Sequence, residues 1–243
     1  MSEDQSGNIE RIRLFLTEPH PCSYLSDRVA TTSFADPTLP INPQIYNQLT
    51  LKGFRRSGNY FYTPACHACQ RCQSARIEVA DFKPNRNQRR CLNRNRDIRV
   101  DLREQVDFEV TFALYGRYLT KRHRNGDMYP PTEDQYRDFI ASPRPETRYL
   151  HFWLEDKLIG CAVTDFLSSG LSAIYTFFDP NYESRSLGRL AILHQIELTR
   201  RLRRPYLYLG YWIEGCSKMD YKTEYVPQQR YINQRWQDVP PVK

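Results

Sequence analysis

The chain has 243 residues, of which 40% are hydrophobic, and its formal net charge is +7. A chain of this length can bury a substantial core without disulfide bonds, and seven cysteines are an odd number for a disulfide framework. No apolar run approaches the roughly 20 residues that a membrane helix needs, and the polar start MSEDQSGNIERIRLF does not resemble a signal peptide. We therefore expect a cytoplasmic protein with no membrane partner.

The N-terminal part of the chain is rich in turn residues and short elements. Residues 41–53, INPQIYNQLTLKG, predict a short helix that ends at Gly53, and residues 54–62, FRRSGNYFY, alternate like a strand. The stretch YTPACHACQRCQSARI then places Cys66, Cys69 and Cys72 at two-residue gaps. This spacing is typical of metal ligands, and Cys22 is a candidate fourth thiolate for zinc or an iron–sulfur cluster. The alternative is a set of buried thiols that shape a pocket.

A basic strip follows from Lys83 to Arg99, where seven basic residues accompany a single acid, Asp97. Asparagine and glutamine side chains lie between them, and these donate and accept hydrogen bonds at phosphates and sugars. A solvated face would have the same composition, but a polyanionic partner explains the uneven charge better. We expect phosphate contacts from Lys83, Arg86, Arg89, Arg90 and Arg94.

The elements after this strip are longer and more regular. Residues 106–119 and 132–140 predict helices, and residues 148–180 predict three antiparallel strands joined by short turns. Leucines recur at helical spacing from about residue 186 to 203, and RPYLYLGYW predicts another strand before the short helical segment CSKMDYK. This order of strands, long helix, strand and helix resembles the acyltransferase core of the GNAT type.

Acetyltransferases with that core bind the pyrophosphate of coenzyme A on backbone amides of a glycine-rich turn at the start of the long helix. The turn here reads SRSLGR and holds one glycine, Gly188, which argues against coenzyme A as the donor. The free amides that follow Arg185 and Ser186 still predict an anion site, with a plain helix start as the alternative.

Five stretches between Pro21 and Pro227 resemble one family closely. They are PCSYLSDRVATTSFADP, YFYTPACHACQRCQSARI, KPNRNQRRCLNRN, AVTDFLSSGLSAIYTFFDP and LGYWIEGCSKMDYKTEYVP. In these the chain is similar to the bacterial aspartate/glutamate leucyltransferases, which are relatives of the arginyl-tRNA–protein transferases. The resemblance implies aminoacyl transfer from a charged tRNA to the N-terminal amine of an acceptor protein, which marks that protein for degradation.

The resemblance also implies an α+β fold with two domains, which we place at residues 1–104 and 105–243. The first is a smaller N-terminal α/β domain that carries the cysteines. The second is a GNAT-like acyltransferase core, an antiparallel sheet with packed helices. The expected donor is leucyl-tRNA, the expected acceptors begin with Asp or Glu, and the chemistry requires no cofactor.

Two residues of the central strands are catalytic candidates. The acceptor amine has a pKa of roughly 7.7–8.0, so most of it must lose a proton before it attacks the donor ester. We expect Asp165 to be the general base, because a carboxylate in an apolar strand is costly unless it is used or well paired; a buried arginine partner is the alternative. Tyr175 on the next strand is expected to orient the ester or donate to the developing oxyanion.

Further candidates concern the two substrates. Besides the basic strip, the expected tRNA-binding residues are Arg185, Ser186 and Gly188 at the helix start and Lys218, Tyr221 and Lys222 in the closing motif. We expect the two lysines near phosphate or the ester carbonyl, and Tyr221 against the terminal adenine. A planar arginine fork matches the acceptor carboxylate best. The candidates are Arg76, which ranks first because it follows the cysteine cluster, and then Arg28, Arg55 and Arg56, with Tyr62 as a further acceptor-binding residue.

An apolar donor side chain also needs a surface that accepts it. We expect that surface on the central strands, at Leu158, Ile159, Ala162, Val163, Ile174 and Phe177. Arginine transfer stays the alternative within the family. A coenzyme A-dependent acetyltransferase and a non-catalytic RNA-binding protein are the alternatives outside it.

Overall fold

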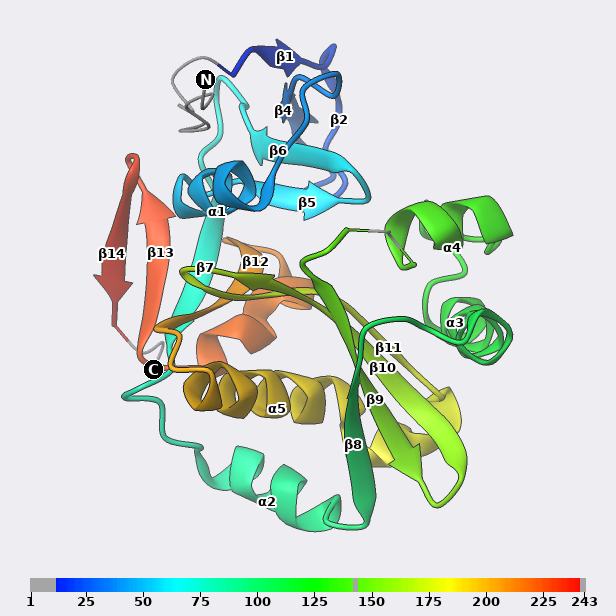
Figure 1. Ribbon diagram of the computed structural model, residues 1–243. Coiled ribbons are helices and arrows are strands. Elements are labelled where there is room, and N and C mark those ends of the chain that lie inside the picture. Colours follow the sequence, from blue (N-terminus) through cyan, green and yellow to red (C-terminus); the bar gives the residue numbers. More distant parts are fainter. Residues whose placement is uncertain (1–11, 142–143, 241–243) are drawn as a thin grey trace, which may run out of the picture.

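The computed structural model describes residues 12–141 and 144–240 of the chain (Figure 1). The first eleven residues, which belong to the polar start discussed above, lie outside this part. Within the described ranges, no helix combines the length and the apolar character that crossing a membrane requires. The architecture is mixed α and β, with one large sheet, one smaller sheet and helices packed against them.

The first part of the chain, residues 12–64, forms an N-terminal unit at one end of the molecule (Figure 1). Its four-stranded sheet has the order β1-β4-β6-β5, and a separate hairpin pairs β2 with β3. The bounds are β1 Leu14–Leu16, β2 His20–Pro21, β3 Val29–Ala30, β4 Thr32–Ala35, β5 Arg55–Ser57 and β6 Tyr60–Pro64. The stretch 54–62, predicted as one strand, is therefore the hairpin β5–β6.

The predicted helix at residues 41–53 is confirmed as α1, Pro43–Leu51. The Asn42 side chain accepts a hydrogen bond from the Ile45 amide, and Pro43 supplies the fixed φ that suits a first helical position. The helix ends before Gly53, whose φ is +84°. A side chain at Gly53 would also meet the Tyr231 ring, because a Cβ built there lies 2.6 Å from Tyr231 Cδ1.

The large sheet has eight strands in the order β14-β13-β7-β12-β11-β10-β9-β8. Its strands are β7 Cys72–Glu78, β8 Ile98–Arg103, β9 Thr147–Leu154, β10 Lys157–Leu167, β11 Gly170–Phe178, β12 Tyr206–Ile213, β13 Gln228–Ile232 and β14 Arg235–Val239. The three predicted antiparallel strands are confirmed as β9, β10 and β11. Since β7 and β8 belong to this same sheet, the boundary drawn between residues 104 and 105 does not separate the two sheets.

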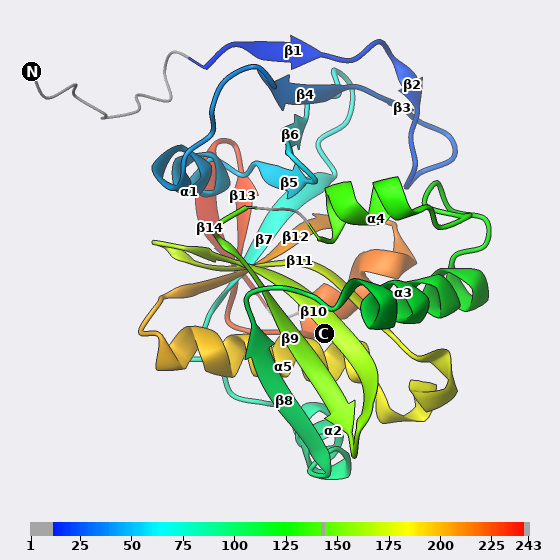
Figure 2. The ribbon, with the colours of Figure 1, turned by 45° about the vertical axis from the view of Figure 1, so that its right-hand side comes forward.

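Helices cover both faces of the large sheet (Figure 2). One face carries α5 Leu187–Arg201, with α2 Arg86–Arg94 packed on it, and the other carries α3 Phe108–Arg122 with α4 Glu133–Phe139 nearby. The predicted helices at 106–119, 132–140 and 186–203 are confirmed, whereas the basic strip was not predicted to hold a helix. Two 3-10 segments, η2 Pro180–Arg185 and η3 Ser217–Glu224, complete the set.

Two neighbouring strands of the large sheet separate partway along their length. Strands β11 and β12 are parallel, are joined through α5, and pair only from Gly170–Tyr206 to Ser172–Tyr208. Both strands continue beyond these residues without pairing to each other. Residues 173–176 are only half-buried, although β11 is an inner strand. We call this region the β11–β12 opening.

A bulge in β12 lies beside the opening. The pairing of β12 with β7 shifts by one residue between Tyr208 and Gly210, and the φ of Gly210 is +81°. Such a backbone conformation favours glycine, and bulges of this kind bend a strand and re-aim its side chains. The bulge therefore accompanies the departure of β12 from β11.

The N-terminal unit docks on the large sheet through polar contacts. The Tyr211 hydroxyl donates to the Gly53 carbonyl at 3.0 Å, and Trp236 Nε1 donates to the Leu51 carbonyl at 2.7 Å. The Ser169 amide donates to Asn47 Oδ1 at 2.8 Å. The unit thus lies against the strand ends of the sheet, near the place where the β11–β12 pair begins.

Candidate active site

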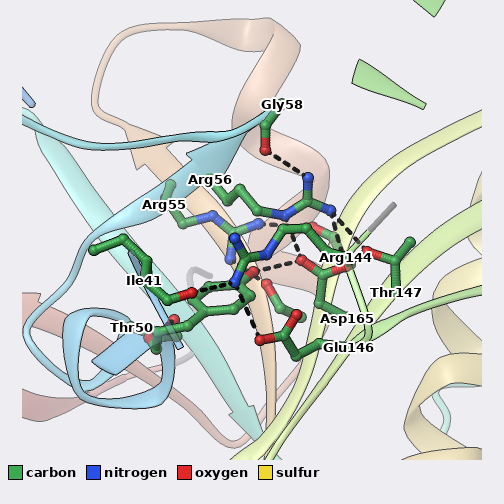
Figure 3. Close-up of polar contacts among 12 residues, drawn as sticks. Ile41, Thr50, Arg55, Arg56, Gly58, Arg144, Glu146, Thr147 and Asp165 are labelled. Atoms are coloured by element: carbon green, nitrogen blue, oxygen red, sulfur yellow. Dashed lines mark hydrogen bonds and ion pairs between the residues drawn. The ribbon is translucent and has the colours of Figure 1, made fainter. Parts of the chain in front are cut away.

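Asp165 lies in β10, faces the N-terminal unit and is fully buried (Figure 3). Its Oδ2 accepts hydrogen bonds from Arg56 Nε and the Tyr46 hydroxyl, each at 2.6 Å. Its Oδ1 accepts from Thr147 Oγ1 at 2.7 Å and from Arg56 Nη2 at 2.9 Å. Each oxygen therefore has two donors, and the side chains of both Asp165 and Arg56 are 0% exposed.

This environment opposes a role for Asp165 as a general base. Burial alone raises the pKa of the carboxyl, but the charge of Arg56 and the hydrogen bonds from Arg56, Tyr46 and Thr147 outweigh burial and lower the pKa. A carboxylate with a lowered pKa and four donors around it is a poor acceptor for a substrate proton. The geometry favours the alternative that the sequence left open, a carboxylate held by a buried arginine.

Arg55, the neighbour of Arg56 in β5, points instead to the β11–β12 opening. Its Nη1 donates to Ser172 Oγ at 2.9 Å and its Nη2 donates to the Ala173 carbonyl at 2.7 Å. The Arg55 side chain also packs against Gly210, where a Cβ would lie 3.4 Å from Arg55 Nε. Arg55 is 6% exposed, and within the described ranges no carboxylate lies within 4.0 Å of its guanidinium. Among the described residues it is a buried cation without a counter-ion, at the place where the strands part.

Lys222 of η3 is a second buried cationic side chain beside the opening. It is 5% exposed, and its Nζ donates to the Tyr211 carbonyl of β12. Burial and, after it, the positive charge of Arg55 lower the pKa of Lys222 to about 7. Lys222 was predicted to lie near a tRNA phosphate or the ester carbonyl; its burial disagrees with a surface phosphate contact and leaves the ester carbonyl as a prediction.

The other two members of the closing motif lie at the surface. Lys218 is exposed, and Tyr221 is 45% exposed. Lys218 lies near the end of α3, where together with Arg122 it helps to lower the pKa of His123, although burial of the ring is the larger cause. The structure thus leaves Lys218 and Tyr221 accessible to a bound nucleic acid.

Tyr175 follows Ala173 on β11 and lies among aromatic rings on the α3 and α4 side. Its ring centroid is 5.3 Å from that of Phe139 and 6.3 Å from those of Tyr115 and Tyr118. Burial is the main cause that raises the pKa of Tyr175, so its hydroxyl stays protonated and can donate a hydrogen bond. Its expected role toward an ester or oxyanion stays a prediction.

The remaining acceptor candidates have different surroundings. Arg76, ranked first from the sequence, is stacked 3.5 Å from the Tyr206 ring centroid and bonds Gln229 Oε1 through Nε and Nη2. Arg28 is exposed and pairs with its neighbour Asp27. Tyr62 of β6 lies near Arg55. Burial raises the pKa of the Tyr62 hydroxyl, and the positive charge of Arg55 lowers that pKa by a smaller amount. The structure therefore brings Arg55 and Tyr62 together, and ties Arg76 into a stack of side chains.

The basic strip and the start of α5 lie side by side. The side-chain Nδ2 of Asn95 donates to the Arg185 carbonyl at 2.9 Å, and the Arg94 guanidinium donates to the Ser184 carbonyl. Arg185 itself forms a bidentate pair with Asp97, at 2.8 and 2.9 Å. Ser186 has a left-handed backbone and caps nothing, and Gly188 is half-buried. All seven basic residues of the strip are exposed, namely Lys83, Arg86, Arg89, Arg90, Arg94, Arg96 and Arg99.

The four candidate metal ligands, Cys22, Cys66, Cys69 and Cys72, are half-buried free thiols. Burial and the neighbouring thiols together raise the pKa of Cys72 to about 12. Among residues 12–141 and 144–240, no three His, Cys, Asp or Glu side chains gather closely enough to hold a metal ion. A zinc or iron–sulfur site at these cysteines stays a prediction from the sequence, and no step of the chemistry is assigned to one.

The apolar surface expected for the donor side chain is mostly part of the core. Five of its members, namely Leu158, Ile159, Ala162, Val163 and Phe177, are buried within the main hydrophobic cluster. Ile174 is half-buried and lies on β11 beside the opening. The prediction was wrong for the five buried residues, because alternation along a strand does not tell which face another helix covers. Sequence reasoning also missed Tyr46, Thr147 and Tyr211, which carry no local motif.

Two family models match the chain. One describes the N terminus of arginine-tRNA-protein transferase and matches residues 20–90, and the other describes its C terminus and matches residues 110–232. Among solved structures, the C-terminal domain of a putative lysylphosphatidylglycerol synthetase from Agrobacterium fabrum has a TM-score of 0.46 at 13% identity, covering 75% of this chain and 55% of that one.

Curated relatives match over nearly the whole length. Proteins named aspartate/glutamate leucyltransferase from Saccharophagus degradans, Teredinibacter turnerae and Pseudomonas aeruginosa are 49%, 50% and 50% identical to this chain. The alignments cover 94%, 95% and 94% of this chain and 98%, 96% and 97% of those proteins. On both grounds the chain belongs to the arginine-tRNA-protein transferase family and is an aminoacyltransferase.

Proposed function

We propose that this protein transfers leucine from leucyl-tRNA to the N-terminal amine of proteins that begin with Asp or Glu, in the cytoplasm. The specificity for acceptors that begin with Asp or Glu is inferred from the Arg55 guanidinium. It is buried at the β11–β12 opening, where it makes two hydrogen bonds and has no carboxylate partner within the described part of the chain. The curated relatives of about 50% identity carry names that agree with this specificity.

A buried cation without a counter-ion is costly, and an anionic ligand would compensate it. A guanidinium has five N–H donors, of which Arg55 uses one toward Ser172 and one toward Ala173. Three donors remain for the side-chain carboxylate of an incoming Asp or Glu. Arg56, one residue further, cannot serve in this way because Asp165 already neutralises it.

The proposal for leucine as the donor has a separate basis. An arginyl donor would need a carboxylate near the ester, but Asp165 of β10 is already paired with Arg56, and Asp179, just after β11, with Lys157 at 2.9 Å. An apolar side chain needs no such partner. Ile174 and the half-buried aromatic Tyr175 offer apolar surface beside the opening.

We also propose that the sheet around the opening is a GNAT-like core, with the aminoacyl ester held between β11 and β12. The parallel β11–α5–β12 connection, the loss of pairing after Ser172 and Tyr208 and the bulge at Gly210 support this. The acceptor then reaches the ester from the Arg55 side. Holding the amine against the ester carbon can supply about 7–11 kcal/mol of the barrier. The exposed arginines of the basic strip are proposed to contact the tRNA phosphates.

The test offers leucyl-tRNA and arginyl-tRNA in parallel to peptides that begin with Asp, Glu, Ala or Lys. We expect leucine on the Asp and Glu peptides only. Efficient transfer of arginine would contradict the donor proposal, and transfer of leucine to the Lys peptide would contradict the acceptor proposal.

The role of Arg55 is tested in the same assay with Arg55→Gln, and Arg235→Ala in the exposed hairpin is the control. Losing charged hydrogen bonds of about 1.5–3 kcal/mol should lower kcat/KM for the Asp peptide by about tenfold to more than a hundredfold. Transfer to the Ala peptide should change little. Equal losses for both peptides would show that Arg55 does not read the acceptor carboxylate.

A further inference from the structure

Lys222 is a buried titratable group for which the proposed reaction has so far no use. Its Nζ lies 5.8 Å from the ring centroid of Tyr221, a residue that is 45% exposed, so the amine lies just inside the surface beside the opening. The acceptor of its hydrogen bond, the Tyr211 carbonyl, belongs to the part of β12 that no longer pairs with β11.

The surroundings of Lys222 suit a neutral amine better than an ammonium. An ammonium has three N–H donors, and within the described residues Nζ has one acceptor, the Tyr211 carbonyl, and no carboxylate within ion-pair distance. The charged group that faces it is the Arg55 guanidinium, and the other titratable neighbour is the Cys216 thiol. Burial together with Arg55 brings the pKa of Lys222 to about 7, so much of the side chain is an uncharged base at neutral pH.

Two other buried titratable groups, Asp165 and His194, are less suitable as the base. Asp165 is shielded from solvent and its oxygens are occupied by Tyr46, Arg56 and Thr147. His194 contacts the Phe152 ring from α5, on the face of the sheet away from α3. A neutral Lys222, by contrast, keeps a free lone pair while one N–H still donates to Tyr211.

We infer that Lys222 is the general base of the transfer reaction, an inference that rests on the proposed function. The acceptor ammonium first loses a proton to Lys222 Nζ, and the free amine then attacks the ester carbon of the aminoacyl-tRNA. The C–N bond forms, the bond between the carbonyl carbon and the ribose oxygen of the terminal adenosine breaks, and Lys222 gives its proton to that oxygen. The attacking nitrogen releases its remaining surplus proton to solvent, so one proton is freed per transfer and the lysine returns to its starting state.

The experiment measures single-turnover transfer by Lys222→Met and Lys222→Arg, at saturating donor and acceptor. Methionine removes the basic nitrogen, and arginine keeps a cation that does not deprotonate. Both variants should lose about 10²–10⁴ in rate, while the affinities for acceptor peptide and tRNA stay within about threefold. Lys52→Met, at an exposed lysine after α1, is the control and should keep the wild-type rate.

A chemical rescue separates a catalytic amine from a structural one. In Lys222→Ala, added methylamine should restore part of the lost rate, with a dependence on pH that follows the free amine. A wild-type rate in Lys222→Arg, or a loss in Lys222→Ala that methylamine does not reverse in folded protein, would overturn the inference. Absence of transfer by the wild-type enzyme itself would instead contradict the proposed function, so the two failures are distinguishable.

Discussion

Replacing Asp165 by Asn separates a structural carboxylate from a catalytic one. The carboxylate accepts four hydrogen bonds, two on each oxygen. An asparagine keeps one oxygen, so in either orientation its amide would face two donors. Arg56 would keep the Gly58 carbonyl, Thr147 and one hydrogen bond to the asparagine oxygen, but it would have lost its counter-ion while 0% exposed.

The size of the effect follows from the burial of the pair. Removing one partner of a buried ion pair typically costs about 3–5 kcal/mol, because the other charge stays buried and unpaired. For a chain of this size, 1 kcal/mol shifts the melting temperature by about 2–4 °C, so Asp165→Asn should melt about 6–20 °C below wild type. Urea unfolding at pH 7 measures the same loss as a lower midpoint at unchanged slope.

A second variant serves as the control for the pair. Asp165→Leu combined with Arg56→Met removes both charges, and it should lose less stability than either single change. If Asp165→Asn instead melts within about 2 °C of wild type and its transfer rate falls by about 10²–10⁴, the carboxylate is the general base and our reasoning from its hydrogen bonds is refuted.

Three further predictions use other parts of the molecule. Changing the exposed Arg86 and Arg90 to Ala should weaken tRNA binding and lower its salt slope by roughly 0.7–0.9 log units per lost phosphate contact; an unchanged slope would remove α2 from the tRNA interface. Between pH 7 and 8 Lys222 is protonated in the unfolded chain but mostly neutral in the folded protein, so the free energy of unfolding should rise by about 1 kcal/mol per pH unit. Urea unfolding of Lys222→Met should show no such rise. Elemental analysis of anaerobically purified protein should find no stoichiometric zinc or iron, and metal lost in Cys69→Ser would contradict this.

Elements with their own local signals were predictable from the sequence. Helix α1 has its Asn42 cap, and the leucine spacing placed α5 within two residues of its true ends. Strand β7 was not predictable, because its burial depends on pairing with β12 and β13, which lie far along the chain. The expected domain boundary at residue 104 failed to follow the sheets for the same reason.

In the candidate site, too, features with a local sequence signal were predictable and those that depend on distant contacts were not. The cost of placing Asp165 in an apolar strand was evident from the sequence, but its partner Arg56 lies 109 residues away, and nothing local distinguishes Arg56 from Arg55. Lys222 was expected near a phosphate or the ester carbonyl, and nothing in its motif indicated that it is buried. Its burial follows from the packing of η3 on β12, a contact that no spacing within the motif encodes.

The place of β7 in the sheet also affects how the protein is made. Its neighbours on both sides, β12 and β13, are synthesised much later than β7 itself, so β7 leaves the ribosome with both edges unpaired. Ala75 and Ile77, which are 0% exposed in the finished protein, are then open to other chains. A nascent chain with such a strand is prone to aggregate, so we expect its yield to depend on chaperones that hold it until residue 232 has emerged.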